Sequence, residues 1–419
     1  MIAKNIERNS QTRGRRRRFA RVVTLAIVIA IALGMSGAIG VIARDASAAS
    51  KGAAAEFHRA GRTRSFASAP HVYEWTYQMN REPPEGMHER SNFDRIGLHR
   101  VAIGKGWGGR ERATADGPVM LYLPGTNMNG EVAVDDPRYS LPLFMATHGV
   151  DFWAIDYRTH FIPAETPKAD LSELKGWTGE LFATDIEAAA DFVMRTTGRS
   201  KIFVAGFSRG ATFAYLFAAQ HPKDVAGLVI YDGWIPLGLT ASSPPPNHYA
   251  DDVAGAHLTY EKRQALMAAV IANPDGPAPI AKYKTARQNL EAVVYGAGGI
   301  FGGHGGLANP AGGYSDAVVL ARMLINYDRY WPTVQDYEDP FTPGELARLS
   351  ESMIPVIAFS SGNIGGRWPA RVAKSASSTG SASVSVTPLA GWGHLDVICG
   401  THAEAEVFEP TLAFVEGKH

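Results

Sequence analysis

Ser208 is the residue whose surroundings predict chemistry most directly. It stands at the centre of a Gly-Phe-Ser-Arg-Gly pentapeptide at positions 206–210. An apolar stretch, 202–205, leads into this pentapeptide, and a stretch with helical spacing, 211–220, follows it. These surroundings are typical of a nucleophile elbow, a tight turn that raises a serine hydroxyl above a sheet and in which larger residues than glycine would collide with the strand and the helix. The pattern predicts a nucleophilic Ser208; the alternative is a glycine-rich loop without chemistry.

A serine hydroxyl needs a general base, and chain position selects His394 among 13 histidines. His394 follows an expected strand at 384–387 and precedes the last expected helix at 403–415. This position predicts a loop at the carboxyl edge of the sheet, the edge at which Ser208 is also expected. A serine followed by a histidine near the chain end is also the order expected for a nucleophile-elbow enzyme. His402, inside the last helix, is the weaker candidate.

The negative oxygen of an acyl-transfer intermediate needs two preorganised N–H groups. The backbone amide of Arg209, the residue after the nucleophile, is expected to be one of them. The other is expected from the Pro-Gly-Thr-Asn stretch at 124–127, which follows an earlier strand. We favour the Thr126 amide, followed by that of Asn127. The alternative is that 124–127 is a plain turn, since Pro-Gly is a common turn pair.

The elements that must position these residues alternate between short apolar strands and helices. Such alternation predicts a parallel sheet covered by helices on both faces. The alternation stops after residue 232 and resumes at 351, so we expect an insertion at 233–350 that caps the carboxyl edge of the sheet, where ligands bind. The core domain is then expected in two parts, 95–232 and 351–419. The expected strands are 71–77, 96–103, 119–123, 152–156, 202–205, 228–231, 355–359 and 384–387, and the expected helices are 139–148, 180–197, 211–220, 261–272, 316–327 and 403–415.

The stretch 185–219, with its pentapeptide, resembles the elbow region of lipases and esterases of the α/β-hydrolase fold. His-Leu-Asp at 394–396, followed by a helix, is similar to the histidine loop of the acid-lipase group, and Asp-Tyr-Arg at 156–158 matches a further segment. The resemblance covers 95–232 and 351–415. It implies an α/β-hydrolase fold and ester hydrolysis through an acyl-enzyme, without a metal or other cofactor. The inserted cap resembles no family.

The chain departs from this family at the acidic residue. Most members carry Asp after the strand that precedes the histidine strand, but residues 360–366 read Ser-Ser-Gly-Asn-Ile-Gly-Gly and hold no carboxylate. Asp232, at the end of the expected strand 228–231, is the best substitute, because some members place the acid there. In the competing hypothesis Asp232 is structural and Asn363 orients His394, although an amide stabilises an imidazolium less well than a carboxylate does.

The N-terminus predicts export. A basic stretch, 15–21, precedes an apolar run at 22–43 and the small residues Ala-Ser-Ala at 46–48, which is the order of a signal peptide cleaved after Ala48. The Arg-Arg-Arg-Phe at 16–19 also resembles a twin-arginine signal. The alternative is an uncleaved membrane anchor, and either hypothesis places the body in the periplasm or outside the cell. Residues 49–94 are expected to be a linker, clearest over 49–68, and an N-terminal extension.

Composition excludes some functions. The chain is 45% hydrophobic and 20% charged, as in globular proteins, and its formal net charge is zero. The basic N-terminus leaves a mildly acidic body, so nucleic acid is not an expected partner. A single cysteine, Cys399, excludes a disulfide framework and a multi-cysteine metal site. We expect a small-molecule ester as substrate, and membrane contact only through an uncleaved N-terminus. The alternatives are a peptidase, an acyltransferase or a non-catalytic binding protein.

Overall fold

The computed structural model describes most of the chain that follows the expected export segment. The described residues are 56–84, 86, 91–105, 110–111, 115–167, 171, 174, 176–237, 259–294, 315–332, 335, 339–365 and 367–418. They belong to one unit, Ala55–His419. The expected signal at 1–48 lies outside the described residues. Within the described ranges no helix is both long and apolar enough to cross a membrane.

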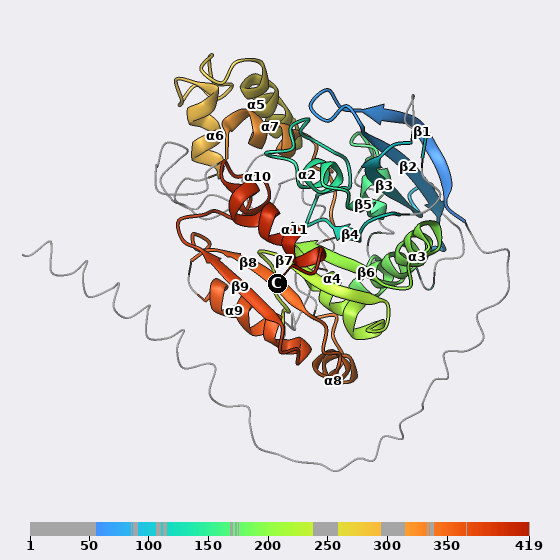
Figure 1. Cartoon of the computed structure of the whole chain (residues 1–419). Coiled ribbons are helices and arrows are strands. Elements are labelled where there is room, and N and C mark those ends of the chain that lie inside the picture. The colour runs from blue at the N-terminus through green and yellow to red at the C-terminus, as the bar shows by residue number, and fades with distance from the viewer. Residues whose placement is uncertain are drawn as a thin grey trace, which may run out of the picture. The chain divides into compact units, whose positions relative to one another are not determined.

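The described residues form one nine-stranded sheet with the order β1-β2-β3-β5-β4-β6-β7-β8-β9 (Figure 1). Strands β1, β2, β3 and β5 pair antiparallel, whereas β5, β4 and β6 to β9 pair parallel in this order. The expected mostly parallel sheet is therefore confirmed. The strands are β1 (His58–Ser65), β2 (Val72–Asn80), β3 (Arg95–Ile103), β4 (Val119–Leu123), β5 (Asp151–Asp156), β6 (Ile202–Phe207), β7 (Val225–Tyr231), β8 (Val356–Ser361) and β9 (Val384–Leu389).

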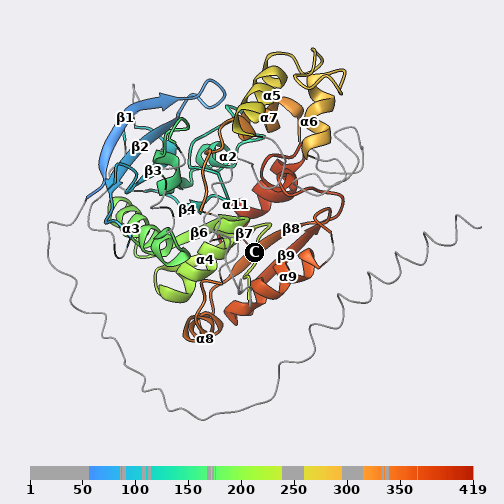
Figure 2. The ribbon, with the colours of Figure 1, turned by 180° about the vertical axis from the view of Figure 1, so that it is seen from behind.

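Helices cover both faces of the sheet, as expected (Figures 1 and 2). Side chains alternate across β4: Met120 and Tyr122 join a hydrophobic cluster with α2 and α11, whereas Leu121 and Leu123 join a second cluster with α3 and α4. Such alternation is the period-two geometry of a strand buried on both faces. The helices outside the insertion are α2 (Leu141–Thr147), α3 (Gly179–Thr197), α4 (Arg209–Gln220), α9 (Trp368–Ala376), α10 (Asp396–Cys399) and α11 (Glu409–Val415), which a π-helical turn (Glu404–Phe408) precedes.

Helix α3 illustrates how the sequence determines these elements. The Thr178 side chain caps its first turn by accepting a hydrogen bond from Leu181 N at 3.3 Å. Its buried residues Ile186, Ala189, Ala190 and Val193 recur at helical spacing and face the sheet. The helix ends at Gly198, whose φ of 69° suits a residue without Cβ.

The first strand corrects the expectation of a linker at 49–68. Residues 58–65 form β1, which pairs antiparallel with β2 at the edge of the sheet. Its sequence, HRAGRTRS, has almost no apolar residue and is almost entirely exposed, so hydrophobic periodicity gave no signal. Because β2 in turn pairs along its length with β3, the part of 49–94 that forms β1 and β2 belongs to the core sheet and is not an extension outside it.

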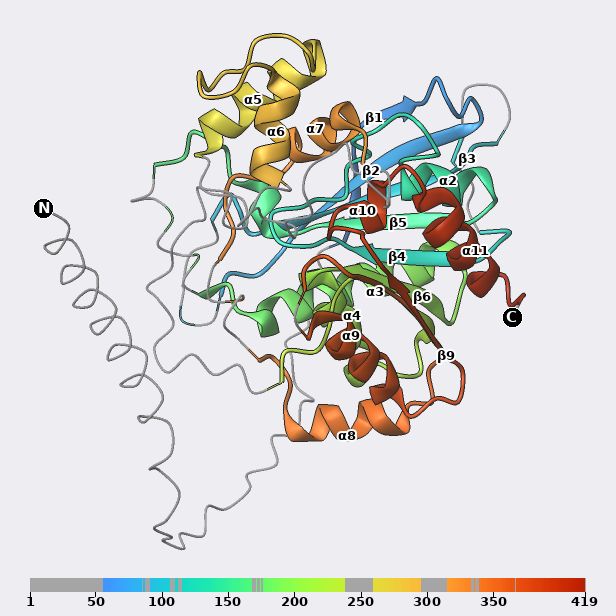
Figure 3. The same cartoon turned by 90° about the vertical axis from the view of Figure 1, so that its left-hand side faces the viewer.

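The insertion between β7 and β8 contains four described helices. Helices α5, α6 and α7 lie together, and α8 lies apart from them (Figures 1 and 3). The Arg348 side chain of α8 donates to Ala219 O at 3.0 Å, and Glu345 accepts from Gln220 at 2.8 Å, so α8 is packed on α4. The last helix of the expected insertion 233–350 thus lies on the core. The four helices are α5 (Tyr260–Ala272), α6 (Ala286–Val294), α7 (Ala317–Ile325) and α8 (Pro343–Glu351).

Candidate active site

Ser208 occupies a strained turn between β6 and α4. Its φ of 54° and ψ of −120° are rare for a residue with a side chain. A Cβ at Gly206 would overlap the Gly210 carbonyl, and one at Gly210 would overlap the Leu123 carbonyl. The Ser208 amide donates to Tyr231 O at 3.0 Å, which ties the turn to the end of β7. The two glycines therefore have the steric role expected of them in a nucleophile elbow.

Asp232 and His394 are brought together although 162 positions separate them. Asp232 follows β7 and is completely buried, and His394 is 7% exposed in the loop after β9. The His394 Nδ1 and Asp232 Oδ2 atoms lie 2.5 Å apart. Because a carboxylate can only accept, Nδ1 carries the hydrogen of this bond, and the second ring nitrogen, Nε2, is the one that can take up a proton.

Three further donors hold the Asp232 carboxylate. The Ser361 amide donates to Oδ1 at 2.7 Å, the Ser361 hydroxyl to Oδ2 at 2.5 Å, and the Trp368 indole to Oδ1 at 2.7 Å. The sequence offered a weak signal for Ser361, which ends the strand beside β7, and none for Trp368. With His394 included, four hydrogen bonds stabilise the ionised carboxylate and fix its orientation.

Asn363, the competing partner for His394, makes different contacts. Its side chain donates to Gly391 O at 2.6 Å, and its amide donates to Trp392 O at 2.9 Å. Asn363 therefore joins the loop after β8 to the backbone before His394. His402, the weaker candidate for the base, is exposed in the turn before the π-helical segment. Of the two acid candidates, the structure brings Asp232 and not Asn363 into hydrogen bonding with the His394 ring.

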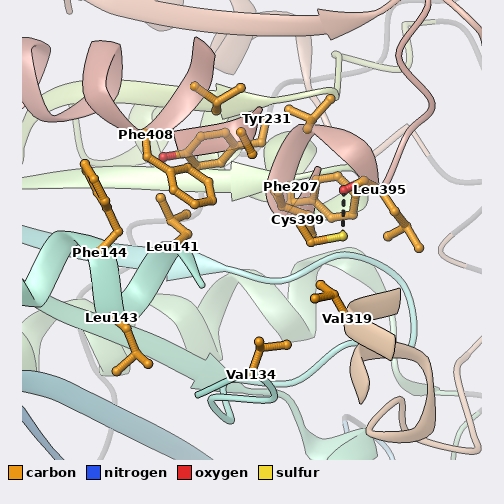
Figure 4. Close-up of a cluster of buried hydrophobic side chains, with 14 of the residues drawn as sticks. Val134, Leu141, Leu143, Phe144, Phe207, Tyr231, Val319, Leu395, Cys399 and Phe408 are labelled. Atoms are coloured by element: carbon orange, nitrogen blue, oxygen red, sulfur yellow. Dashed lines mark hydrogen bonds between the residues drawn. The ribbon is translucent and has the colours of Figure 1, made fainter. Parts of the chain in front are cut away.

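The loop with His394 packs against the strand with the elbow. The Phe207 ring centroid lies 4.5 Å from that of His394, and the Trp368 ring meets the same imidazole edge-on at 5.8 Å. Figure 4 shows Phe207 beside Leu395 and Cys399, which follow the histidine in the chain. Since Phe207 directly precedes Ser208, this packing holds the histidine loop close to the serine turn.

The loop after β4 lies against Ser208 on its other side. A Cβ at Gly125 would be 3.0 Å from Ser208 Cβ, so glycine is needed for this close approach. The Tyr157 hydroxyl donates to Pro124 O at 3.1 Å and holds the start of the loop. Thr126 follows and is half-buried, and Asn127 has a φ of 61° and is fully buried. The loop of Thr126 is thus beside the serine, and Arg209 is the first residue of α4.

A network of buried charges lies beneath this loop. His99 lies between Glu74 and Asp156, with 2.8 Å from a ring nitrogen to each carboxylate. Burial alone would lower the pKa of His99, but the two carboxylates outweigh it and raise the pKa to about 10. The same carboxylate of Asp156 accepts from the Gly130 amide at 2.7 Å. The network therefore fixes the far end of the loop that carries Thr126, and no motif or spacing along the chain indicates it.

A mainly apolar pocket of about 80 Å³ opens beside the same loop. Six of its lining residues are Met128, Tyr139, Leu141, Phe152, Met323 and Ile398. They come from the loop after β4, helix α2, strand β5, helix α7 and the short α10. Within the described part of the chain no group of three or more His, Cys, Asp or Glu residues is arranged to hold a metal ion.

The site is assembled at the carboxyl ends of the parallel strands. Comparison with known families gives a match between residues 118–295 and the alpha/beta hydrolase fold family. The sheet order, the strained serine after β6 and this match define a protein of the α/β-hydrolase fold. Within this class, several proteins that the chain resembles are described as lipases.

Two human proteins, lipase member K and lipase member M, are 23% and 22% identical to it over 146 and 139 residues. The matched segments cover 34% and 32% of this chain. They cover 36% and 33% of the two relatives, so the chain spans about a third of the length of these curated proteins. The crystal structure of a "putative lipase" from Sulfolobus solfataricus is 25% identical, with a TM-score of 0.66 over 87% of this chain and 99% of that one.

Proposed function

We propose that this chain is an exported serine hydrolase that cleaves carboxylic esters through an acyl-enzyme on Ser208. The observation that carries the proposal is the buried Asp232–His394 hydrogen bond at the edge of the sheet where Ser208 occupies its strained turn. His394 is the general base, Asp232 is the acid that orients it, and the amides of Thr126 and Arg209 form the oxyanion hole.

The reaction follows from these positions. The Ser208 hydroxyl attacks the ester carbonyl carbon as His394 Nε2 takes its proton, and the carbonyl electron pair moves to the oxygen, which the two amides stabilise. Collapse of this intermediate expels the alcohol, which leaves with the proton from His394. Water then attacks the acyl-enzyme by the same route and releases the carboxylic acid. Asp232 keeps the hydrogen on Nδ1 and stabilises the imidazolium that forms twice per cycle.

The apolar pocket beside the loop after β4 supports an ester with an apolar acyl group. Its volume of about 80 Å³ is smaller than the roughly 150 Å³ cavity that holds benzene in an engineered protein interior. Ser208, Thr126 and His394 are not among the residues that line this pocket, and short acyl chains are the expected substrates if it receives the acyl group. A peptidase or an acyltransferase would use the same residues, because the pocket and the insertion decide the substrate.

The insertion supports a cap over the site. Ser315, just before α7, donates to Asp396, two residues after His394. Asp328, just after α7, donates to the backbone of Asn127. The segments on either side of α7 therefore contact both the loop that carries His394 and the loop that carries Thr126. We propose that α5 to α7 form this cap, whereas α8 belongs to the core.

A fluorophosphonate probe and a panel of p-nitrophenyl esters of graded acyl length test the enzyme against a binding protein. Labelling at Ser208 and turnover of short esters are expected. Ser208→Ala should abolish both, with a change in stability below about 1 kcal/mol because this side chain is only partly buried. Labelling or turnover that survives in Ser208→Ala would reject the nucleophile, and an unlabelled wild-type protein would favour a non-catalytic binding function.

Export is tested separately. N-terminal sequencing of the mature protein should give a start near Ala49 if the signal is cleaved, whereas membrane-bound protein that begins at Met1 indicates an anchor. Replacement of Arg16 and Arg17 by Lys should stop export through a twin-arginine route, and a protein that still crosses uses the general secretory route.

A further inference from the structure

One end of helix α7 is bound to the loop that carries His394. The Ser315 amide and hydroxyl both donate to Asp396 Oδ1, at 3.0 and 2.9 Å. The other carboxylate oxygen, Asp396 Oδ2, accepts from the Gly393 amide at 2.8 Å. Asp396 is completely buried. Ser315 is thus connected through one fixed carboxylate to the residue that directly precedes His394.

The other end of α7 is bound to the loop that carries Thr126. The Asp328 amide donates to Asn127 O at 2.7 Å, and the Asn127 side chain donates back to Asp328 O at 3.1 Å. A second reciprocal pair joins Asn129 and Asn326, with bonds of 2.8 and 3.2 Å. These four bonds hold the left-handed conformation of Asn127 and so set the backbone next to Thr126.

The Asp328 carboxylate anchors this end to the core. Its Oδ1 accepts from Asn129 at 3.0 Å and from His160 at 2.9 Å. Burial disfavours the charged imidazole, but the carboxylates of Asp156 and Asp328 outweigh burial and raise the pKa of His160 to about 10. Asp328 therefore faces a cation that remains protonated at neutral pH.

Helix α7 itself is a short rigid element between these two ends. The Asp316 side chain caps it by accepting from the amides of Val318 and Val319, at 2.8 and 3.2 Å. Its nine residues span about 13 Å along the helix axis. Leu320 and Leu324 are buried in the cluster that includes Phe207 and Leu395. A displacement of one end is thus transmitted to the other.

We propose that α7 is a brace that fixes the oxyanion loop relative to the histidine loop, with Ser315 and Asp328 as its positioning residues. The inference rests on the proposed esterase function, because Thr126 and His394 must then act on the same tetrahedral intermediate. The oxyanion donors have to lie within about 3 Å of the charged oxygen, so a small drift between the two loops weakens catalysis. Neither positioning residue needs to touch the substrate.

Asp328→Ala and Ser315→Ala test the brace in the full chain, with Arg322→Ala, at an exposed position of α7, as the matched control. Asp328→Ala should lower kcat about 10- to 100-fold per titrated active site and leave KM within about 2-fold, since ground-state binding is not affected. Inhibition by phenylboronic acid, which forms a tetrahedral adduct with a serine, should weaken in the same proportion. Asp328→Asn keeps the acceptor and should restore part of the rate, and Ser315→Ala should give a smaller loss of the same kind.

Hydrogen exchange separates a brace from a local structural role. In Asp328→Ala, amide exchange should accelerate over 125–130 and also over 391–396, at the opposite end of α7. Acceleration at only one loop, or an unchanged kcat per titrated site, overturns the brace. Ser315→Ala provides the same readouts from the other end if Asp328→Ala does not fold.

The failure of the brace is distinguishable from the failure of the proposed function. A wild-type chain that turns over esters, and a Ser208→Ala variant that does not, establish the function whatever the α7 variants do. If the wild-type chain hydrolyses no ester, the catalytic role of the brace falls with the proposed function.

Discussion

The described part of the chain holds two buried pairings of histidine with carboxylate, and their surroundings differ. His394 meets Asp232 through Nδ1 at the carboxyl edge of the parallel strands, beside the strained Ser208. His99 lies among β2, β3 and β5, with Glu74 on Nδ1 and Asp156 on Nε2. Because both ring nitrogens of His99 face carboxylates, neither can accept a proton from a substrate. The proposed catalytic role of His394 therefore rests on Ser208 at the same edge of the sheet and not on the histidine–carboxylate contact alone.

The largest expected effect is the loss of activity in Asp232→Asn. The amide keeps the size of the side chain, but its NH₂ group favours the wrong tautomer of His394, so kcat should fall by up to about 10⁴-fold. Asn363→Ala is the matched control, because Asn363 hydrogen-bonds to the backbone of the histidine loop. Steady-state kinetics with a p-nitrophenyl ester measure both variants. The reverse ranking would assign the third catalytic position to Asn363, and two mild effects would leave a Ser-His dyad.

Much of this first pairing could be predicted from the sequence. Ser208, Asp232 and His394 each follow an expected strand, and the ends of parallel strands meet at one edge of a sheet. Ser361 and Trp368 were not predicted as partners of Asp232, because such contacts depend on the register between β7 and β8 and on the packing of α9. Chain order is enough to propose which residues are catalytic. The hydrogen bonds that orient their side chains can be seen only in the structure.

The second pairing could not be predicted. Glu74, His99 and Asp156 lie on three different strands, and no spacing along the chain connects them. Strand β1 was missed for a related reason, since it has no apolar alternation and is defined only by its pairing with β2. The same applies to α8, whose contacts with α4 place it on the core. Features that rest on long-range polar contacts leave little trace in hydrophobic periodicity.

His99→Gln should reduce stability more than activity. The substitution removes the buried cation that contacts both Glu74 and Asp156 and leaves only the half-exposed Arg64 and the more distant His160 beside them. This loss should cost about 3 kcal/mol in the free energy of unfolding. His221→Gln is the control, because this half-exposed histidine lies 3.8 Å or more from its two carboxylates and its loss should cost under about 1 kcal/mol. Urea unfolding compares the two. Equal losses would mean that the second pairing has no special structural role.

Alkaline pH should weaken the second pairing without any substitution. His99 and His160 have a pKa of about 10 in the folded chain, against an ordinary value of 6.5. A raised pKa means that the folded state binds these protons more tightly, so their contribution to stability is complete below pH 6.5 and is lost as the pH rises through 10. The melting temperature should therefore fall by about 5 °C or more between pH 7 and pH 10. His99→Gln should show a smaller fall, and an identical fall would attribute the pH dependence to other groups.

The smallest expected effect concerns substrate choice beside the first pairing. Met323 of α7 lines the pocket of about 80 Å³ next to the loop after β4, so Met323→Trp should fill much of that space. If the pocket receives the acyl chain, kcat/KM for longer p-nitrophenyl esters should fall by about 10- to 100-fold relative to the acetate, because an overfilled apolar site costs about 1–3 kcal/mol. Arg322→Trp adds the same ring at the exposed neighbouring position and should leave the profile unchanged. A chain-length profile that is the same in both variants would place the acyl group elsewhere and leave the Asp232–His394 pairing untouched.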